Sequence, residues 1–207
     1  MKNLTVILAV IITALLKFIM ADWLNLRSFY ITAACLFWFA FIFVSYKKDP
    51  LVMKNWGFQR KNFRKSLLSL LPFAFVISGG SIVYGIIFNA FFLNWHILPV
   101  LVLYPAWGLI QQFIVAGLAA GNLRLMTDGR LTDTQINLFI SLLFSLIHYP
   151  DVPLMMYTFI MEFFLIRAYF KFNNLWVLGL YHGWLSGIFI FIVLGRDLWD
   201  EWLFIFQ

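Results

Sequence analysis

Long apolar runs alternate with short polar connectors along nearly the whole chain. Each run has roughly the 20 residues that an α-helix needs to cross the hydrocarbon core of a bilayer. A helix satisfies its own backbone hydrogen bonds in lipid, whereas the alternating ~10-residue segments of a membrane β-barrel are not seen here. Seven membrane-spanning helices are therefore predicted, over residues 4–21, 28–46, 67–91, 96–120, 134–149, 153–171 and 175–195.

Composition supports a membrane protein with no soluble domain of any size. Of the 207 residues, 63% are hydrophobic and only 12% are charged, whereas a soluble domain carries roughly 25% charged residues. The predicted fold class is all-α: a polytopic membrane helix bundle of about seven transmembrane helices. The formal net charge of +6 does not indicate nucleic-acid binding, because the basic residues gather in the connectors between apolar runs.

Those basic residues also predict the orientation of the chain. The connector at 47–65 holds seven lysines and arginines against the single acidic residue Asp49, and such loops stay in the cytoplasm. The N-terminus, the loop at 121–133 and the turn at 167–174 then lie on the same side, and most acidic loop residues lie on the other. We expect a cytoplasmic N-terminus and an external C-terminus, with the tail at 193–207 forming a short interfacial helix.

Smaller features refine this picture of the bundle. The first apolar run continues through Met20 with no small-residue cleavage pattern, so it is predicted to be an uncleaved helix. The single cysteine, Cys35, excludes an internal disulfide and is expected to be a small buried hydrophobic residue. The Gly79-Gly80 pair in the third predicted span indicates close helix packing.

Polar side chains inside the spans are costly in lipid and therefore mark candidate sites. Gln111 and Gln112 are neighbours in the fourth span, offset by about 100° on a helix, so at least one should face the bundle interior. His182 and Ser186 lie four residues apart, on one face of the last span. Glu162, in the sixth span, is expected to be protonated, paired or hydrated. Interhelical hydrogen bonding and a functional cavity are both compatible with this pattern.

Missing motifs exclude several classes of membrane enzyme. The chain has no HExxH zinc-peptidase helix, no rhomboid-type GxSG, no pair of intramembrane aspartates and no P-loop. Its three histidines are too few for a membrane di-iron desaturase.

Three polar motifs nevertheless follow one another in a recognisable order. Residues 111–117 read QQFIVAG, residues 144–148 read FSLIH and residues 182–186 read HGWLS. This order resembles the CPBP family of CAAX proteases and bacteriocin-processing enzymes, whose pattern is EExxxR, then FxxxH, then HxxxN or HxxxD. The resemblance covers residues 54–192. It divides the chain into two N-terminal helices with the start of the cytoplasmic loop (1–53), a CPBP-like core (54–192) and an interfacial tail (193–207).

The resemblance implies a peptidase site with named parts. His148 would help to position a water molecule, and His182 would stabilise the oxyanion with Ser186 as a weaker donor. Gln111 and Gln112 would occupy the positions of the family's two glutamates, and Ala116 stands where the family has arginine.

The two glutamines change what this site can do. A carboxamide cannot accept a proton as a carboxylate does, so the family's general base is missing. A carboxamide is also a poorer ligand for a divalent metal, so the sequence supports no particular metal or other cofactor. Two replacements for the base are available: Glu162 from the sixth span, or His148 acting alone. The predicted spans place His148 nearer the outer face than the glutamines, so it joins them only if the fifth helix is bent or re-entrant.

Three functions remain open. The first is an intramembrane peptidase that cleaves a membrane-associated or lipidated peptide by histidine-assisted water activation. The second is a catalytically impaired pseudoprotease that acts as a binding or immunity protein, and the third is a small transporter. The expected partners are the lipid bilayer and a membrane-associated peptide or protein, and the resemblance implies a bacterial cytoplasmic membrane.

Overall fold

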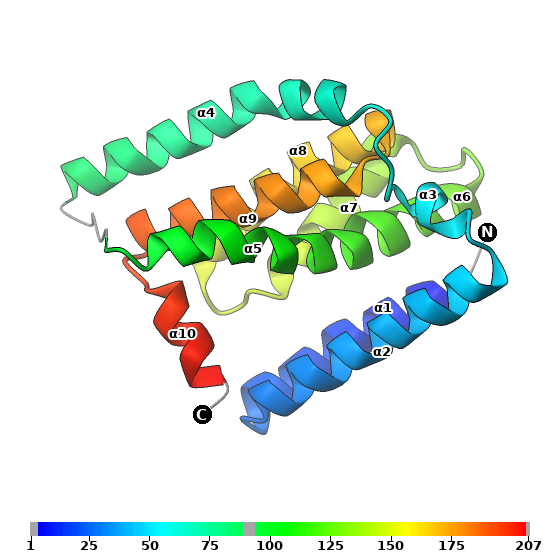
Figure 1. The fold of residues 1–207 in the computed structure, drawn as a ribbon, viewed down its shortest axis with the longest axis horizontal. Helices are drawn as coiled ribbons and strands as arrows, with labels where there is room; N and C mark the ends of the chain where they lie inside the picture. Colours follow the sequence, from blue (N-terminus) through cyan, green and yellow to red (C-terminus); the bar gives the residue numbers. More distant parts are fainter. Residues whose placement is uncertain (1–3, 89–93, 206–207) are drawn as a thin grey trace.

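Every regular element in the described part of the chain is a helix (Figure 1). The computed structural model describes residues 4–88 and 94–205. The predicted all-α bundle is confirmed. In chain order the elements are α1 (Leu4–Leu16), the π-helix η1 (Lys17–Trp23), α2 (Arg27–Lys48), α3 (Val52–Trp56), α4 (Phe63–Ile87), α5 (Ile97–Gln112), the π-helix η2 (Phe113–Ala120), α6 (Gly121–Thr127), α7 (Asp133–Leu146), α8 (Val152–Phe172), α9 (Leu175–Ile192) and α10 (Leu198–Ile205).

Six helical stretches among the described residues are long and apolar enough to cross a membrane: α1–η1, α2, α4, α5–η2–α6, α8 and α9. The predicted fifth span, 134–149, is present only as the shorter apolar helix α7, which has 14 residues. At 1.5 Å per residue such a helix covers about 21 Å, less than the ~30 Å of a hydrocarbon core. The third predicted span begins earlier than expected, at Phe63, and its predicted end at 91 lies outside the described residues.

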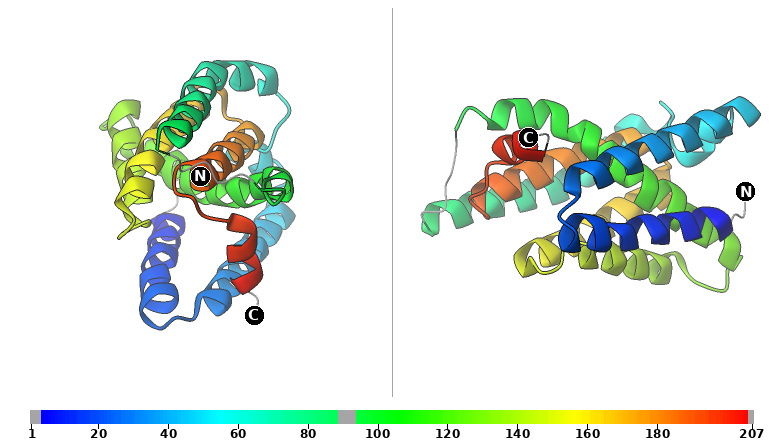
Figure 2. Two further views of the ribbon diagram at one scale, coloured as in Figure 1. Left: turned by 90° about the vertical axis from the view of Figure 1, so that its left-hand side faces the viewer. Right: turned by 90° about the horizontal axis from the view of Figure 1, so that it is seen from below.

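Helix α9 is the centre of the molecule. It makes the most extensive helix–helix contact of the described chain with α5, and it also packs against α4 and α8, while α7 packs on the far side of α8. The α1–α2 hairpin lies along one side of this core in Figure 1 and in the left view of Figure 2, and α1 contacts η2 and α6. Most of its apolar side chains are exposed, as expected for helices whose partner is lipid.

Helices α5 and α9 approach closely because glycines line their contact. A Cβ atom at Gly179 would lie 2.8 Å from Leu109 Cα, and one at Gly108 would lie 2.7 Å from the Gly179 carbonyl oxygen. Small residues let helix backbones meet in this way in membranes. The prediction that Gly79-Gly80 marks a close contact is wrong: no atom of the described residues lies within 4 Å of a Cβ placed at either glycine. Both glycines lie on α4 where no other helix packs.

The connector around α3 is fastened to the turn between α8 and α9. The Asn174 amide donates to the carbonyl oxygens of Gln59 and Lys61 at 2.8 and 3.0 Å, and its oxygen accepts from Val177 N–H, capping α9. Tyr169 donates from its hydroxyl to the Trp56 carbonyl oxygen at 3.0 Å. These bonds fold the connector over one end of the bundle. The long polar stretch of the sequence is therefore an ordered cap.

The two ends of the described chain lie at opposite ends of the bundle (Figure 1). The short helix expected in the tail at 193–207 is present as α10, which packs near the start of α5. The Trp202 ring lies 5.4 Å from the ring of Tyr104. The tail therefore turns back onto the bundle.

Candidate functional site

A glutamine, a carboxylate and a histidine from three helices meet in the bundle core. Gln112, the last residue of α5, donates from Nε2 to Glu162 Oε2 of α8 at 2.6 Å. The same nitrogen lies 3.0 Å from His182 Nδ1 of α9. Gln112 and Glu162 are fully buried, and His182 is 3% exposed. One oxygen of Glu162 is thus hydrogen-bonded to a neutral carboxamide.

The helix changes its winding directly after Gln112. α5 ends there, and the π-helix η2 begins at Phe113. Its wider turn shifts the side-chain register, and such segments are frequent at functional sites. Gln112 is buried while Gln111 is partly exposed. This confirms that at least one of the two glutamines faces the interior.

His148 reaches the core because α7 is short. The helix ends at Leu146, and His148 lies in the turn that follows. The Phe144 ring makes an edge contact with each of the two histidines, with its centroid 5.3 Å from that of His148 and 5.7 Å from that of His182. The fifth helix is therefore not a straight full span. The predicted spans required such a departure if His148 was to lie near the other site residues.

Two predicted site residues lie beside this network. Ser186 shares a face with His182 as expected, but its hydroxyl donates to Met161 Sδ at 3.5 Å. Gln111 makes no hydrogen bond through its buried Oε1 with any described residue. The structure therefore joins Gln112, Glu162 and His182 directly, joins His148 through a shared aromatic neighbour, and leaves Ser186 and Gln111 outside the hydrogen-bonded set.

Several buried polar atoms at the site have no hydrogen-bond partner among the described residues. They are Gln112 Oε1, Glu162 Oε1 and His148 Nε2. Buried polar groups are nearly always satisfied by protein, water or ligand. An amide nitrogen can only donate, so a neutral His182 ring that accepts this bond on Nδ1 carries its proton on Nε2, where it can serve as a donor. The site thus offers hydrogen-bond acceptors and one donor to a polar ligand or a water molecule.

The site has no set of three metal ligands. Among the described residues, the group of histidine, cysteine, aspartate and glutamate side chains close enough to share an ion is His96, Asp197 and Asp200. Those residues lie near the starts of α5 and α10, and Glu162, His148 and His182 are not among them.

A cavity close to the site is lined by residues other than Gln112, Glu162, His148 and His182. A cavity of about 580 Å³ opens between the α1–α2 hairpin and the core, and Trp56, Gly117 and Tyr169 are part of its wall. Phe113, the neighbour of Gln112, is 2% exposed, and its ring lies 5.1 Å from that of Trp56. The buried set is therefore closed, with aromatic rings on the side of this cavity.

The glycines that position His182 were not predicted from the sequence. Gly179, Gly183 and Gly187 are spaced by four residues in α9, and the first two press against α5. This small-xxx-small spacing is a known signature of close helix contact in membranes. It was a better signal than the adjacent pair Gly79-Gly80, because residues four apart share a helix face.

Comparison with known proteins gives one family match, over part of the chain. Residues 129–188 match the family described as Type II CAAX prenyl endopeptidase Rce1-like. No curated protein and no solved structure matches the chain. The matched segment contains His148, Glu162 and His182, and Gln112 precedes it. Over residues 129–188, therefore, this membrane-spanning helical protein is similar to the Rce1-like Type II CAAX prenyl endopeptidases, the group that its motifs indicated.

Proposed function

We propose that the chain is a membrane-embedded peptidase that hydrolyses a peptide bond in a membrane-associated or lipidated peptide. One observation carries the proposal: Gln112 links the Glu162 carboxylate to His182 in the buried core, and both partners lie within the segment that is similar to CAAX endopeptidases. Carboxyl and imidazole groups are the side chains that most often transfer protons in general acid–base catalysis. The sequence lacks the family's glutamates in the first motif, and here Glu162 supplies a carboxylate from α8.

The reaction needs only a water molecule and the peptide. Glu162 takes a proton from water as the water oxygen attacks the carbonyl carbon. The Nε2–H of His182 donates to the oxygen of the tetrahedral intermediate, the step at which preorganised donors contribute most. Glu162 then returns the proton to the leaving nitrogen as the C–N bond breaks, which yields a carboxylic acid and an amine.

The remaining polar residues have supporting roles. Gln112 is a positioning residue, since its one nitrogen orients both Glu162 and His182. His148 holds the attacking water through its unpartnered Nε2. Ser186 can turn from Met161 to the oxyanion as a weaker donor.

Substrate enters from the cavity between the α1–α2 hairpin and the core. Its wall includes Lys48 and Arg124 at the rim and apolar residues such as Phe41 and Leu118 below them. A wall of this kind suits an amphipathic peptide at the membrane surface. Because Gln112 and Glu162 are fully buried, entry requires that the Trp56–Phe113 contact open.

The test is a comparison of protein termini in membranes. Cells that carry the wild-type chain are compared with cells that carry His148→Ala/His182→Ala. We expect new N-termini with the wild type that are absent with the double variant, because the variant loses both imidazoles. Tyr84→Phe, on the exposed side of α4, is the matched control and is expected to behave as the wild type. Equal sets of termini from folded, equally abundant proteins would overturn the peptidase and leave a binding protein on the same scaffold.

The orientation is proposed from charge. The α3 connector with its seven basic residues faces the cytoplasm, and the turn between η1 and α2 faces outward. In a Cys35→Ser background, we expect an impermeant thiol reagent to label Leu24→Cys in intact cells and to label Lys61→Cys only after the membrane is opened. Both side chains are exposed. The reverse labelling pattern would invert the proposed topology.

A further inference from the structure

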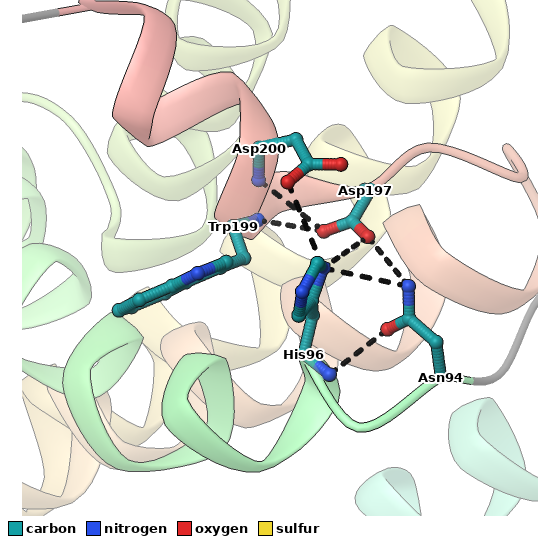
Figure 3. Close-up of polar contacts among 5 residues, drawn as sticks. All are labelled: Asn94, His96, Asp197, Trp199 and Asp200. Atoms are coloured by element: carbon teal, nitrogen blue, oxygen red, sulfur yellow. Dashed lines mark hydrogen bonds and ion pairs between the residues drawn. The ribbon is translucent and has the colours of Figure 1, made fainter.

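A compact polar group joins the start of α5 to the start of α10 (Figure 3). His96 is the residue before α5, Asp197 precedes α10, and Asp200 lies in its first turn. Asn94 completes the group from the chain just before His96. The two segments lie about a hundred residues apart in the sequence, so the group is made by the fold.

The ligand-type atoms of this group point at one another. His96 Nδ1 lies 2.7 Å from Asp197 Oδ2 and 3.7 Å from Asp200 Oδ1. One such atom from each of the three side chains lies within 4.8 Å of the others. Asn94 Nδ2 donates to the same Asp197 oxygen at 2.7 Å. In Figure 3 the His96 side chain extends from the start of α5 toward the side chains of Asp197 and Asp200, which come from the start of α10.

Asp197 is fixed in this orientation by the backbone of α10. Its other oxygen, Oδ1, accepts from the backbone N–H groups of Trp199 and Asp200 at 3.0 and 3.4 Å. The side chain is 10% exposed and that of His96 is 18% exposed. Outer hydrogen bonds that hold a carboxylate in place are typical of metal sites, because they orient the ligand before the ion arrives.

The charge of the group also favours a cation. The group contains two carboxylates and one imidazole. The nearest arginine in the sequence, Arg196, is paired with other carboxylates. Arg196 donates to Glu201 from Nε at 2.7 Å and from Nη1 to Asp151 at 3.1 Å. The hydrogen bond to Glu201 is the main cause of the raised pKa of the Arg196 guanidinium. No arginine or lysine is paired with Asp197 or Asp200 among the described contacts.

We propose that His96, Asp197 and Asp200 bind one divalent transition-metal ion, with zinc as the best fit, which fastens α10 to the start of α5. One imidazole nitrogen and two carboxylate oxygens suit zinc, whereas magnesium and calcium prefer oxygen alone. Zinc ligands at about 2.0–2.2 Å from the ion lie about 3–3.5 Å apart. The His96–Asp197 hydrogen bond therefore opens around the ion, and Asp200, whose side chain is 52% exposed, turns inward to complete the set.

The experiment uses the full-length protein, purified in detergent and freed of metal with a chelator. Zinc is titrated by calorimetry, and thermal unfolding is followed with and without zinc. We expect saturable binding of one zinc per chain and a Tm that rises with zinc concentration, because an ion that binds only the folded state stabilises it. Magnesium at the same concentration is expected to leave Tm unchanged.

Matched variants decide between a site and adventitious binding. His96→Gln and Asp200→Asn are expected to abolish the saturable binding and the zinc-dependent rise in Tm. Asn94→Ala removes the outer hydrogen bond to Asp197 and the acceptor of the His96 backbone N–H, and leaves the three metal ligands in place. It is expected to weaken binding by about 10-fold. Glu201→Gln changes a carboxylate of the same helix that faces Arg196, and it is expected to bind zinc as the wild type does.

Two outcomes would contradict the proposed metal site. No saturable binding by the wild type, or equal binding by His96→Gln and Asp200→Asn, would show that the group is a hydrogen-bonded latch only. The Tm of each variant without zinc shows whether it folds, so a loss of binding cannot be confused with unfolding. The result is independent of peptidase activity.

Discussion

Glu162→Gln is expected to lower the rate of peptide cleavage by about 10²- to 10⁴-fold, the range that a general base contributes. The replacement keeps the shape of the side chain and can still bond to Gln112, so the fold is expected to survive. It removes the ability of the group to take a proton from water. The measurement is the rate at which the termini produced by the wild type appear with each variant, normalised to the amount of folded protein.

A swap of the two side chains gives the sharper test. Glu162 Oε2 and Gln112 Nε2 lie 2.6 Å apart, so the double change Gln112→Glu/Glu162→Gln moves the carboxylate from α8 to α5 across a single hydrogen bond. We expect it to recover part of the cleavage that Glu162→Gln loses. Gln112→Glu alone places two carboxyl groups side by side and is expected to be destabilising, since like charges at this distance repel.

The controls separate chemistry from folding. Tm is measured for every variant, and Glu162→Leu, which cannot make the hydrogen bond at all, reports how much stability that bond supplies. Undiminished cleavage by Glu162→Gln would show that Glu162 is not the base. The alternative of His148 acting alone would then predict that His148→Gln has the larger effect.

The helices and their order could be predicted from the sequence because the lipid environment simplifies the problem. A run of about 20 apolar residues has one stable structure in a bilayer, and runs such as 28–46 and 175–195 contain little else. The length of α7 could not be predicted in this way. Its apolar residues continue past Leu146, but the chain turns at 147–150, and hydropathy alone carries no signal for that turn.

Part of the site could be predicted because polar residues in spans are rare. Gln112, Glu162 and His182 were all identified from that rule, and the structure places them within hydrogen-bonding distance. Which glutamine faces inward could not be predicted, because the change from α5 to the π-helix η2 alters the side-chain phase at that point. The group around His96 was also missed. Its members lie at the starts of two helices about a hundred residues apart in the sequence, and polar residues are ordinary at such positions.

Gly183→Ala is expected to destabilise the protein by about 3 kcal/mol or more, at or above the upper end of the usual cost of overpacking. A Cβ atom at Gly183 would lie 2.5 Å from Pro105 Cα and 2.7 Å from the Tyr104 carbonyl carbon, and closer still to Pro105 N. These are backbone atoms of α5, so no side-chain rotation relieves the clash. The two helices must separate, and His182, one residue away, must then move relative to Gln112.

The matched control is Gly80→Ala on α4. Within the described part of the chain, nothing lies within 4 Å of a Cβ atom at Gly80, and alanine favours a helix interior by about 1 kcal/mol over glycine. The same substitution is therefore expected to leave stability unchanged or raise it at one site and to lower it sharply at the other. Thermal unfolding in detergent, followed by circular dichroism, measures both. An equal Tm for Gly183→Ala and the wild type would show that α5 and α9 are not held this closely. The Gln112–His182 contact, on which the proposed peptidase site depends, would then lose its structural basis.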